Sequence, residues 1–346
     1  MTWGRRAFVQ VEGRRVHLRT LGRGPAVLLL HGSPQASRAV EGAARAVAAM
    51  GLCAIAPDTP GNGRSDPLPD AAPDTEAYAR ALVALCDRLG LRRVGLYGFH
   101  TGAATACVFG ALFPDRTAAL ALDGLPAWTE AERARLLDGY LPPFAPAWDG
   151  SHMAWLWARM EEQTLFFPWH APEPWARMDY DVSAPAHVHA NCMDLLDAGD
   201  AYRPAYRAAF AFRAEAWTDR LTAPALIATT AADVLREHLD RPGLAGRGTV
   251  LADAPALWAA AATRLAEFPG DPAPDAFERA EEGFGFVDVG GERLAWSGPP
   301  GARSLRLHDA GGRREDVSAT DALALDLPGH GDSAEGWRAA PGSLDD

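Results

Sequence analysis

The sequence contains no lysine, because all 33 of its basic residues are arginine. Schiff-base chemistry and cofactors that are held through a lysine are therefore excluded. Cysteine is scarce as well, and no two cysteines have the close spacing of a zinc or redox motif. We expect separate buried thiols, as in a reducing compartment, with no metal. The four positions are Cys53, Cys86, Cys107 and Cys192.

The sequence also lacks an excess of basic residues and long apolar runs. Acidic residues outnumber basic ones by 45 to 33, and a net charge of −12 argues against nucleic acid as a partner. No apolar run approaches the length of a membrane span, and the first residues lack the apolar stretch of a signal peptide. We predict a globular cytoplasmic protein with neither a nucleic acid nor a membrane as a partner.

Short apolar runs alternate with helical patterns along the chain. Segments 8–13 and 14–22 predict an opening hairpin, and segments 37–50 and 75–89 predict helices. Several further runs are mostly apolar, as expected of strands that are buried on both faces. They cover residues 26–32, 52–58, 92–98, 118–124 and 224–230. This order predicts a mostly parallel sheet flanked by helices.

Three stretches resemble a known family. "LLLHGSP" (28–34) resembles its oxyanion loop, "DTPGNGRSDP" (58–67) the loop after the next strand, and "YGFHTGA" (97–103) its nucleophile elbow. The chain thus resembles the α/β-hydrolase fold family over residues 8–125, with a weaker match to about residue 268. The resemblance implies a core formed by residues 1–124 and 221–270, and an enzyme that needs no cofactor.

The elbow of this family holds Ser, Cys or Asp at the position that His100 occupies here. A neutral imidazole needs no second residue to activate it, so His100 could act as a base or as a nucleophile. The helix that begins at Thr101 directs its positive end toward this residue, which should keep His100 neutral. In the alternative interpretation, the elbow is a relic and His100 only fills a pocket.

The other members of the site follow from the resemblance. The acid of the family follows a strand, which indicates Asp233 or, as the alternative, Asp123. The histidine expected about two dozen residues after Asp233 is missing, since Arg247, Gly248 and Thr249 lie there. We therefore predict that His100 bonds directly to Asp233. The backbone amides of Ser33 and Thr101 would form the oxyanion hole.

Residues 125–220 depart from the alternation and hold seven of the eleven tryptophans. They predict a helical cap over the elbow, with a pocket for a small hydrophobic molecule. His31 invites a metal interpretation, but a third ligand is missing and support of its loop by hydrogen bonds is favoured. His187 and His189 are two residues apart and could share a strand face. The expected pocket residues are His31, Phe99, Trp128, Trp155, His187 and His189.

A partial internal repeat follows a linker at residues 271–283. "FVDVGGERLAW" (286–296) parallels "FVQVEGRRVHL" (8–18), and "ALALDLPGHGDS" parallels "CAIAPDTPGNGRS". Residues 284–338 therefore predict a duplication of the N-terminal strands without a second elbow. Such strands expose edges, so we expect them to pair with the main sheet or to form a homo-oligomer.

Two classes of function fit these features. The first is a hydrolase that acts on a small hydrophobic ester, thioester, lactone or activated carbonyl compound through His100. The second is a lyase, a cofactor-free oxygenase or a binding protein. The resemblance favours the first class, and the missing late histidine favours the second.

Overall fold

The computed structural model describes residues 3–274 and most of the C-terminal part. The described C-terminal residues are 283–289, 292–299, 301–309, 311–317, 321–327 and 330–333. The chain divides into a large unit, which includes residues 3–6 and 10–274, and a smaller unit, which includes residues 7–9 and the described C-terminal residues.

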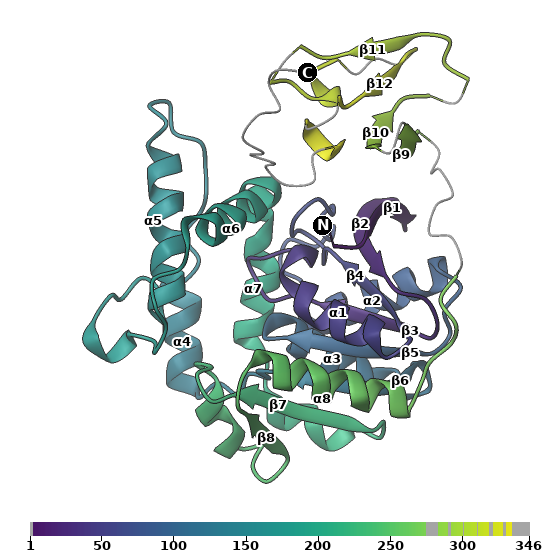
Figure 1. Ribbon diagram of the computed structural model, residues 1–346. Helices are drawn as coiled ribbons and strands as arrows, with labels where there is room; N and C mark the ends of the chain where they lie inside the picture. The colour runs from purple at the N-terminus through teal and green to yellow at the C-terminus, as the bar shows by residue number, and fades with distance from the viewer. Residues whose placement is uncertain are drawn as a thin grey trace. The chain divides into compact units, whose positions relative to one another are not determined.

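An eight-stranded sheet forms the centre of the large unit, in the order β1-β2-β4-β3-β5-β6-β7-β8 (Figure 1). β2 is antiparallel to β4, and every pair from β4 to β8 is parallel, which confirms the predicted sheet. The bounds are β1 (Arg5–Val11), β2 (Arg14–Leu21), β3 (Ala26–Leu30), β4 (Cys53–Pro57), β5 (Val94–Phe99), β6 (Thr117–Asp123), β7 (Ala225–Thr230) and β8 (Gly248–Leu251).

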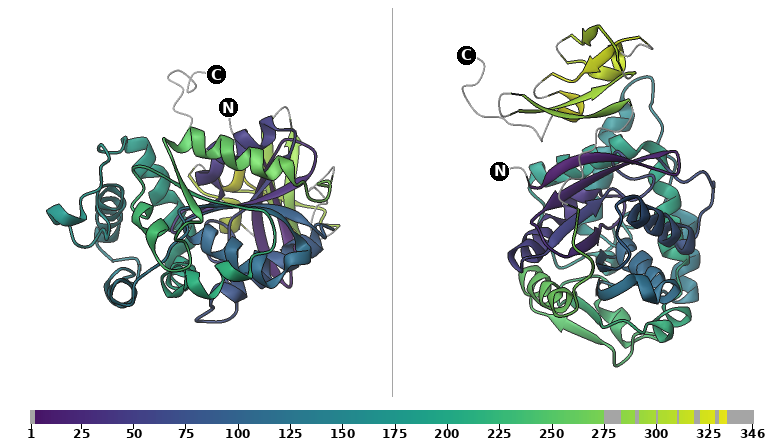
Figure 2. Two further views of the ribbon diagram at one scale, coloured as in Figure 1. Left: turned by 90° about the horizontal axis from the view of Figure 1, so that it is seen from below. Right: turned by 90° about the vertical axis from the view of Figure 1, so that its right-hand side faces the viewer.

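Helices cover both faces of this sheet, as Figure 2 shows. α1 (Glu41–Ala49) and α8 (Ala254–Glu267) pack on one face, and α2 (Thr75–Arg88) and α3 (Thr101–Leu112) on the other. The Asp74 side chain accepts the amide of Ala77 at 2.9 Å and so caps α2, which ends just before Gly90 as predicted. All four cysteines are buried free thiols.

Four helices between β6 and β7 form the cap. They are α4 (Glu130–Gly139), α5 (Ser151–Leu165), α6 (Pro185–Ala198) and α7 (Tyr202–Ala211). Trp128, Tyr140 and Trp169 are buried together in an aromatic cluster, whereas Trp148 is 99% exposed. The tryptophans therefore serve both the interior and the surface of the cap. No helix in the described part of the chain is long and apolar enough to cross a membrane.

The predicted linker begins later than residue 271. The amide of Ala26 donates to the carbonyl of Asp271 at 2.8 Å, and the Asp271 carboxylate accepts the amide of Arg92 at 2.7 Å. Backbone contacts with the sheet continue to Ala273, whose amide donates to Gly24. Residues 275–282 of the predicted linker lie outside the described residues.

The C-terminal unit contains a second sheet, in the order β11-β12-β10-β9. Its strands are β9 (Phe284–Val289), β10 (Glu292–Ser297), β11 (Leu305–Leu307) and β12 (Leu323–Leu325). β10 is antiparallel to both β9 and β12, and β11 is parallel to β12. This is the order of β3, β4, β2 and β1 in the large unit, which supports the predicted duplication.

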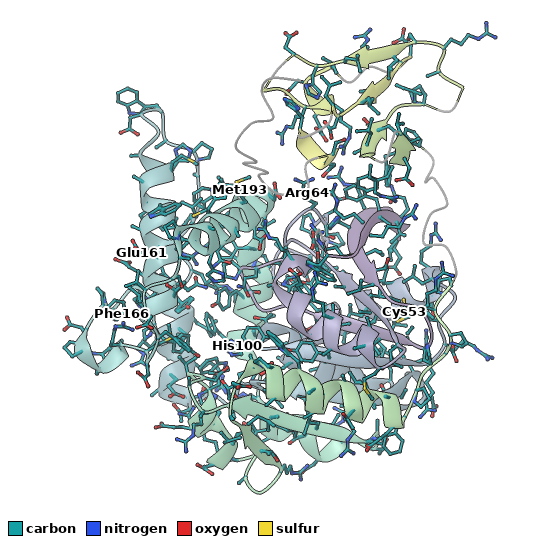
Figure 3. The ribbon with its side chains drawn as sticks, viewed as in Figure 1. Cys53, Arg64, His100, Glu161, Phe166 and Met193 are labelled. Carbon is teal, nitrogen blue, oxygen red and sulfur yellow. The ribbon has the colours of Figure 1, made fainter. Side chains whose placement is uncertain are left out.

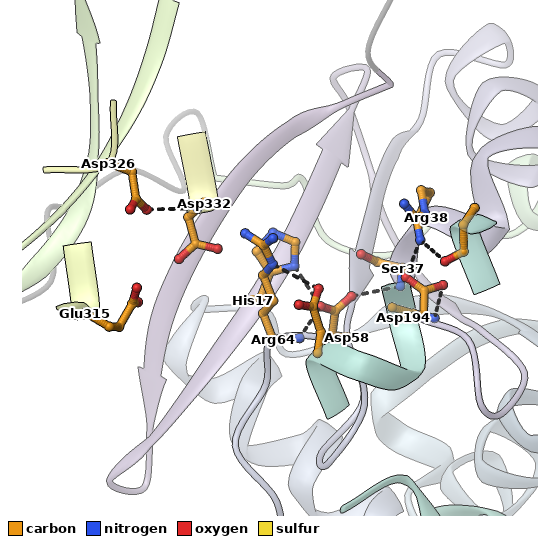
Figure 4. A network of polar contacts seen from close by, with 12 residues as sticks. His17, Ser37, Arg38, Asp58, Arg64, Asp194, Glu315, Asp326 and Asp332 are labelled. Atoms are coloured by element: carbon orange, nitrogen blue, oxygen red, sulfur yellow. Dashed lines mark hydrogen bonds and ion pairs between the residues drawn. The ribbon is translucent and has the colours of Figure 1, made fainter. Parts of the chain in front are cut away.

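The polar contacts at the ends of these strands are repeated too. Asp58 follows β4 and accepts the amides of Ser37 at 2.8 Å and Arg64 at 2.9 Å. Asp326 follows β12 and accepts the amides of Arg314 at 2.6 Å and Asp332 at 2.8 Å. Figure 4 shows both carboxylates. Equivalent buried carboxylates thus bind equivalent loop amides in the two units.

The side chain that pairs with this carboxylate differs between the units. In the large unit, the Nδ1 atom of His17 lies 2.9 Å from Asp58. Ala295 takes the place of His17 in the repeat, and the guanidinium of Arg314 pairs with Asp326 and Asp332 instead. A buried carboxylate needs compensating donors, and each unit supplies them from a different strand or turn.

Candidate active site

The turn between β5 and α3 places His100 in a sparsely populated conformation, with φ of 48° and ψ of −105°. Two glycines allow α3 to approach the strands at this turn. A Cβ atom at Gly98 would lie 2.3 Å from the carbonyl oxygen of Gly102, and one at Gly102 would lie 2.2 Å from that of Leu30. The backbone therefore has the form of a nucleophile elbow, with an imidazole at its apex.

The side chain of His100 contacts the predicted acid. Its Nε2 atom lies 2.9 Å from Oδ2 of Asp233, just beyond the end of β7. The amide of Leu235 donates to the other oxygen of this carboxylate at 2.7 Å. Asp123, the alternative acid, accepts the Tyr97 hydroxyl at 2.6 Å, and only its backbone carbonyl bonds to His100. The geometry therefore favours Asp233 as the partner of His100.

The charges around His100 set its protonation. Burial lowers the pKa of His100, but the charge and hydrogen bond of Asp233 and the charge of Asp123 outweigh burial and raise this pKa. The carboxylates thus outweigh the lowering expected from the N-terminus of α3, because they act on the ring at short range. Burial opposes ionisation of Asp233, yet the charge and hydrogen bond of His100 lower its pKa. Burial raises the pKa of Asp123 to about 7.

The two ring nitrogens of His100 have different surroundings. The Asp233 carboxylate can only accept a hydrogen bond, so the neutral imidazole carries its proton on Nε2. The Nδ1 atom has no hydrogen-bond partner among the described residues, which leaves its lone pair available. The ring also stacks on Phe99, with centroids 3.9 Å apart and an interplanar angle of 21°.

Gly124 is a site residue that the sequence analysis did not identify. It has a φ of +63°, and a Cβ atom there would lie 2.4 Å from Cδ2 and 2.7 Å from Nε2 of His100. Any side chain at this position would displace the ring from Asp233. The only sequence signal is a glycine directly after the strand that ends at Asp123.

A cavity of about 490 Å³ lies between the sheet and the cap, and His100 is in its wall (Figure 3). Phe99, Trp128 and His187 line it as expected. The sequence analysis missed most of the cap residues at this cavity because their spacing shows no single pattern. Those with polar groups include Tyr140, Gln163, Thr164, Tyr180, Asn191 and Tyr206.

Three expected pocket residues lie elsewhere. His31 is buried, with Nδ1 bonded to the carbonyl of Gly32 and Nε2 accepting the amide of Thr59 at 3.0 Å, so it supports the loop. Trp155 packs against other aromatic rings of the cap. His189 is exposed on α6, and because α6 is a helix rather than a strand, His187 and His189 point in different directions.

No group of three or more His, Cys, Asp or Glu side chains in the described residues is arranged to hold a metal ion. The amides expected to form the oxyanion hole belong to residues that line the cavity beside His100. Thr101 is the first residue of α3, and the Ser33 amide lies 3.4 Å from its Oγ1 atom. The oxyanion role of both amides remains a prediction.

The missing late histidine has no replacement in the described part of the chain. Only Ala252 and Asp253 connect β8 to α8, and Asp253 caps the helix through the amide of Ala256 at 2.8 Å. His238 packs edge-on against Trp128, but its Nδ1 atom accepts a hydrogen bond from the amide of Ala127 at 2.9 Å. Burial lowers the pKa of His238 to about 4. His100 is therefore the candidate base of this site.

Replacing Gly124 with alanine should separate His100 from Asp233. We expect the pKa of His100 to fall toward its ordinary value and any turnover to decrease about a hundredfold. NMR titration of the imidazole would measure the first effect. Gly150→Ala is the matched control, because Gly150 also has a positive φ, of +76°, but nothing lies within 4 Å of its Cβ position. Equal titration of His100 in both variants would contradict the predicted clash.

Comparisons with known proteins agree with the fold. A family model described as the alpha/beta hydrolase fold matches residues 25–182. The protein "Epoxide hydrolase 2" of Siraitia grosvenorii is 37% identical over 113 residues, which is 32% of this chain and 36% of that relative. The 2-hydroxy-6-oxo-6-phenylhexa-2,4-dienoate hydrolase of Burkholderia cepacia is 33% identical over 113 residues, 32% of this chain and 40% of that relative. The chain thus covers well under two thirds of either relative.

Solved structures match over a longer range. Epoxide hydrolase A from Mycobacterium thermoresistibile superposes with a TM-score of 0.55 and 22% identity, covering 72% of this chain and 92% of that one. A Vigna radiata epoxide hydrolase mutant superposes with a TM-score of 0.56 and 17% identity, covering 76% and 96%. The sheet order, the elbow and these matches together show that the chain has the α/β-hydrolase fold.

Proposed function

We propose that the protein is a hydrolase in which His100 acts as the general base. The observation that carries this proposal is the hydrogen bond of 2.9 Å between His100 Nε2 and Asp233, with Nδ1 left unpartnered among the described residues at the cavity. The substrate class is a small hydrophobic compound with one electrophilic carbon. The names of the relatives favour an epoxide, and the amides at the elbow also suit an ester, thioester, lactone or activated carbonyl compound.

In this mechanism, a water molecule next to Nδ1 of His100 attacks the electrophilic carbon. Its proton passes to Nδ1, and the Asp233 carboxylate stabilises the imidazolium that forms. Negative charge develops at the same time on the substrate oxygen. The amides of Thr101 and Ser33 would stabilise this charge, because the N-terminus of α3 favours an anion.

Tyrosines of the cap would donate a proton to the substrate oxygen. Burial raises the pKa of Tyr206 and, together with nearby carboxylates, that of Tyr180, both to about 12, so both phenols stay protonated. The Tyr206 hydroxyl donates to the Tyr140 hydroxyl at 3.2 Å, which leaves the Tyr140 proton free for an acceptor in the cavity. These phenols suit an epoxide oxygen, whose ring opening requires a proton.

Residue 100 has neither a hydroxyl nor a carboxylate, so it cannot form an ester intermediate with substrate. Attack by the imidazole itself would instead produce an acyl-imidazole. A second candidate function is proton abstraction from a substrate carbon, as in a lyase or a cofactor-free oxygenase. The absence of a histidine from the short connection between β8 and α8 favours this alternative.

The substitution His100→Ala tests the proposal. We expect kcat/KM for the hydrolysed substrate to fall by about 10²–10⁴-fold, since a positioned general base contributes that much. The assay uses a panel of epoxides, esters, thioesters and lactones, with mass spectrometry to detect acylated enzyme. His189→Ala is the control, because His189 is exposed and does not line the cavity. Binding of these compounds without turnover in the wild-type protein would instead identify a binding protein.

The pH dependence supplies a second test. A general base works in its unprotonated form, and Asp233 and Asp123 raise the pKa of His100 despite its burial. We therefore expect kcat/KM to fall on the acid side of a pKa above 6.5. Asp233→Asn removes the nearest charge and should move this limb to lower pH as well as reduce the rate. Asp138→Asn, on the exposed surface of α4, should leave the limb in place. If Asp233→Asn does not shift the pH at which kcat/KM falls, the proposed pairing of His100 with Asp233 in catalysis is refuted.

The C-terminal strands suggest self-association. Leu305 and Leu307 of β11 are 56% and 52% exposed, and β11 has a strand on only one side among the described residues. We infer that this edge pairs with a second copy of the chain. Sedimentation velocity over a range of concentrations should show a dimer that Leu307→Asp weakens. A monomer at every concentration would contradict this inference.

A further inference from the structure

Helix α6 of the cap is bound to the loop that carries Ser33. In this loop, residues 32–38, the amide of Ala36 donates to Oδ2 of Asp194 at 3.2 Å. The guanidinium of Arg38 donates to Oδ1 of the same carboxylate at 2.6 Å. Asp194 is 6% exposed, and Figure 4 shows it beside Arg38 and Ser37. One buried carboxylate of the cap therefore binds two groups of the loop.

The next amide of the loop is held from the opposite side. Ser37 donates its backbone N–H to Asp58 at 2.8 Å, and Asp58 is buried beside His17 in the core of the large unit. Two consecutive amides thus bond to two different carboxylates. Asp58 belongs to the core, whereas Asp194 belongs to the cap. The position of the loop depends on both.

The C-terminal repeat shows the same loop without a cap. Arg313 and Arg314 correspond to Ala36 and Ser37, and the amide of Arg314 bonds to Asp326 as that of Ser37 bonds to Asp58. The amide of Arg313, however, donates to Asp316 of its own turn at 2.8 Å.

The corresponding position in the large unit is Ala39, which has no carboxylate. The turn itself is the same in both units, because Ala39 donates to the carbonyl of Ala36 just as Asp316 donates to that of Arg313, both at 2.9 Å. The Ala36 amide therefore bonds to the cap in place of a local acceptor.

Further contacts involve the same face of α6. The amide group of Gln35 donates to Asn191 at 3.4 Å, and both side chains line the cavity. Asp197 pairs with Arg64 at 3.2 Å. Asn191, Asp194 and Asp197 recur every three residues, which places them along one side of the helix. This face of α6 is thus matched to the loops beside the elbow.

We propose that Asp194 is a positioning residue that couples docking of the cap to formation of the oxyanion hole. When α6 is docked, Asp194 holds Ala36 and Arg38, and the loop keeps Ser33 in the cavity wall, where its amide donates to Oγ1 of Thr101 at 3.4 Å. When α6 moves away, the Ala36 amide loses its acceptor and the loop loses its order. The catalytic consequence rests on the proposed function, but the order of the loop does not.

Amide hydrogen exchange at residue resolution tests the coupling directly. In Asp194→Ala, we expect the Ala36 amide to exchange about tenfold faster, since one hydrogen bond is lost. The Ser37 amide should keep its protection through Asp58 and so serves as an internal control. Met193→Ala, an exposed change on the same helix, should alter neither amide. Unchanged exchange at Ala36 in Asp194→Ala would overturn the proposal.

A rescue variant separates the loop from the cap. Ala39→Asp introduces the carboxylate that Asp316 supplies in the repeat, at an exposed position. Combined with Asp194→Ala, it should restore protection of the Ala36 amide while the contact of α6 with this amide remains absent. No restoration in a folded double variant would show that the repeat is a poor guide to this loop and would count against the proposal.

Kinetics then connect the loop to the reaction. In Asp194→Ala, we expect kcat to fall about tenfold with a smaller change in KM, because the oxyanion is bound mainly in the transition state. The rescue variant should recover most of kcat. If the wild-type protein has no hydrolytic turnover, the proposed function fails while the exchange experiment still decides the coupling. A KM effect alone, with kcat intact, would contradict the role of Asp194 in positioning the loop.

Discussion

The site depends on one steric constraint, the close approach of the His100 ring to the backbone at Gly124. The elbow holds residue 100 at a positive φ and directs its side chain across the ends of β6 and β7. The ring reaches Asp233 only because Gly124 has no side chain to occupy the same space. An imidazole is long enough to make this contact directly, so two residues occupy a region where the fold family has three.

The C-terminal unit shows which parts of this fold are independent of the site. It keeps the strand order and the buried carboxylate that binds two loop amides, with Asp326 in the place of Asp58. Asp316 provides within one turn the contact that Asp194 provides from the cap. Half of the sheet and its loops can thus form with local contacts. The elbow and the cap add the groups that surround the cavity.

The polar residues of the cavity come from both layers of the large unit. His100 and Asp233 lie at the ends of strands, where the sheet fixes their separation. The phenols of Tyr140 and Tyr206 come from the cap. The contact of Asp194 with the loop at residues 32–38 joins the cap to the core near His100. Catalysis would therefore respond to changes in the cap that do not touch the substrate.

The sequence by itself determined the sheet, the elbow and the pairing of His100 with Asp233, because apolar runs, turn glycines and strand ends are local features. Tertiary structure alone decided that Gly124 must lack a side chain, that α6 presents Asp194 to Ala36, and that His31 does not line the cavity. It also decided the direction in which the pKa of His100 shifts, since Asp123 and Asp233 act together on the ring and outweigh its burial. These outcomes depend on distances between residues far apart in the chain, and no local pattern encodes such distances.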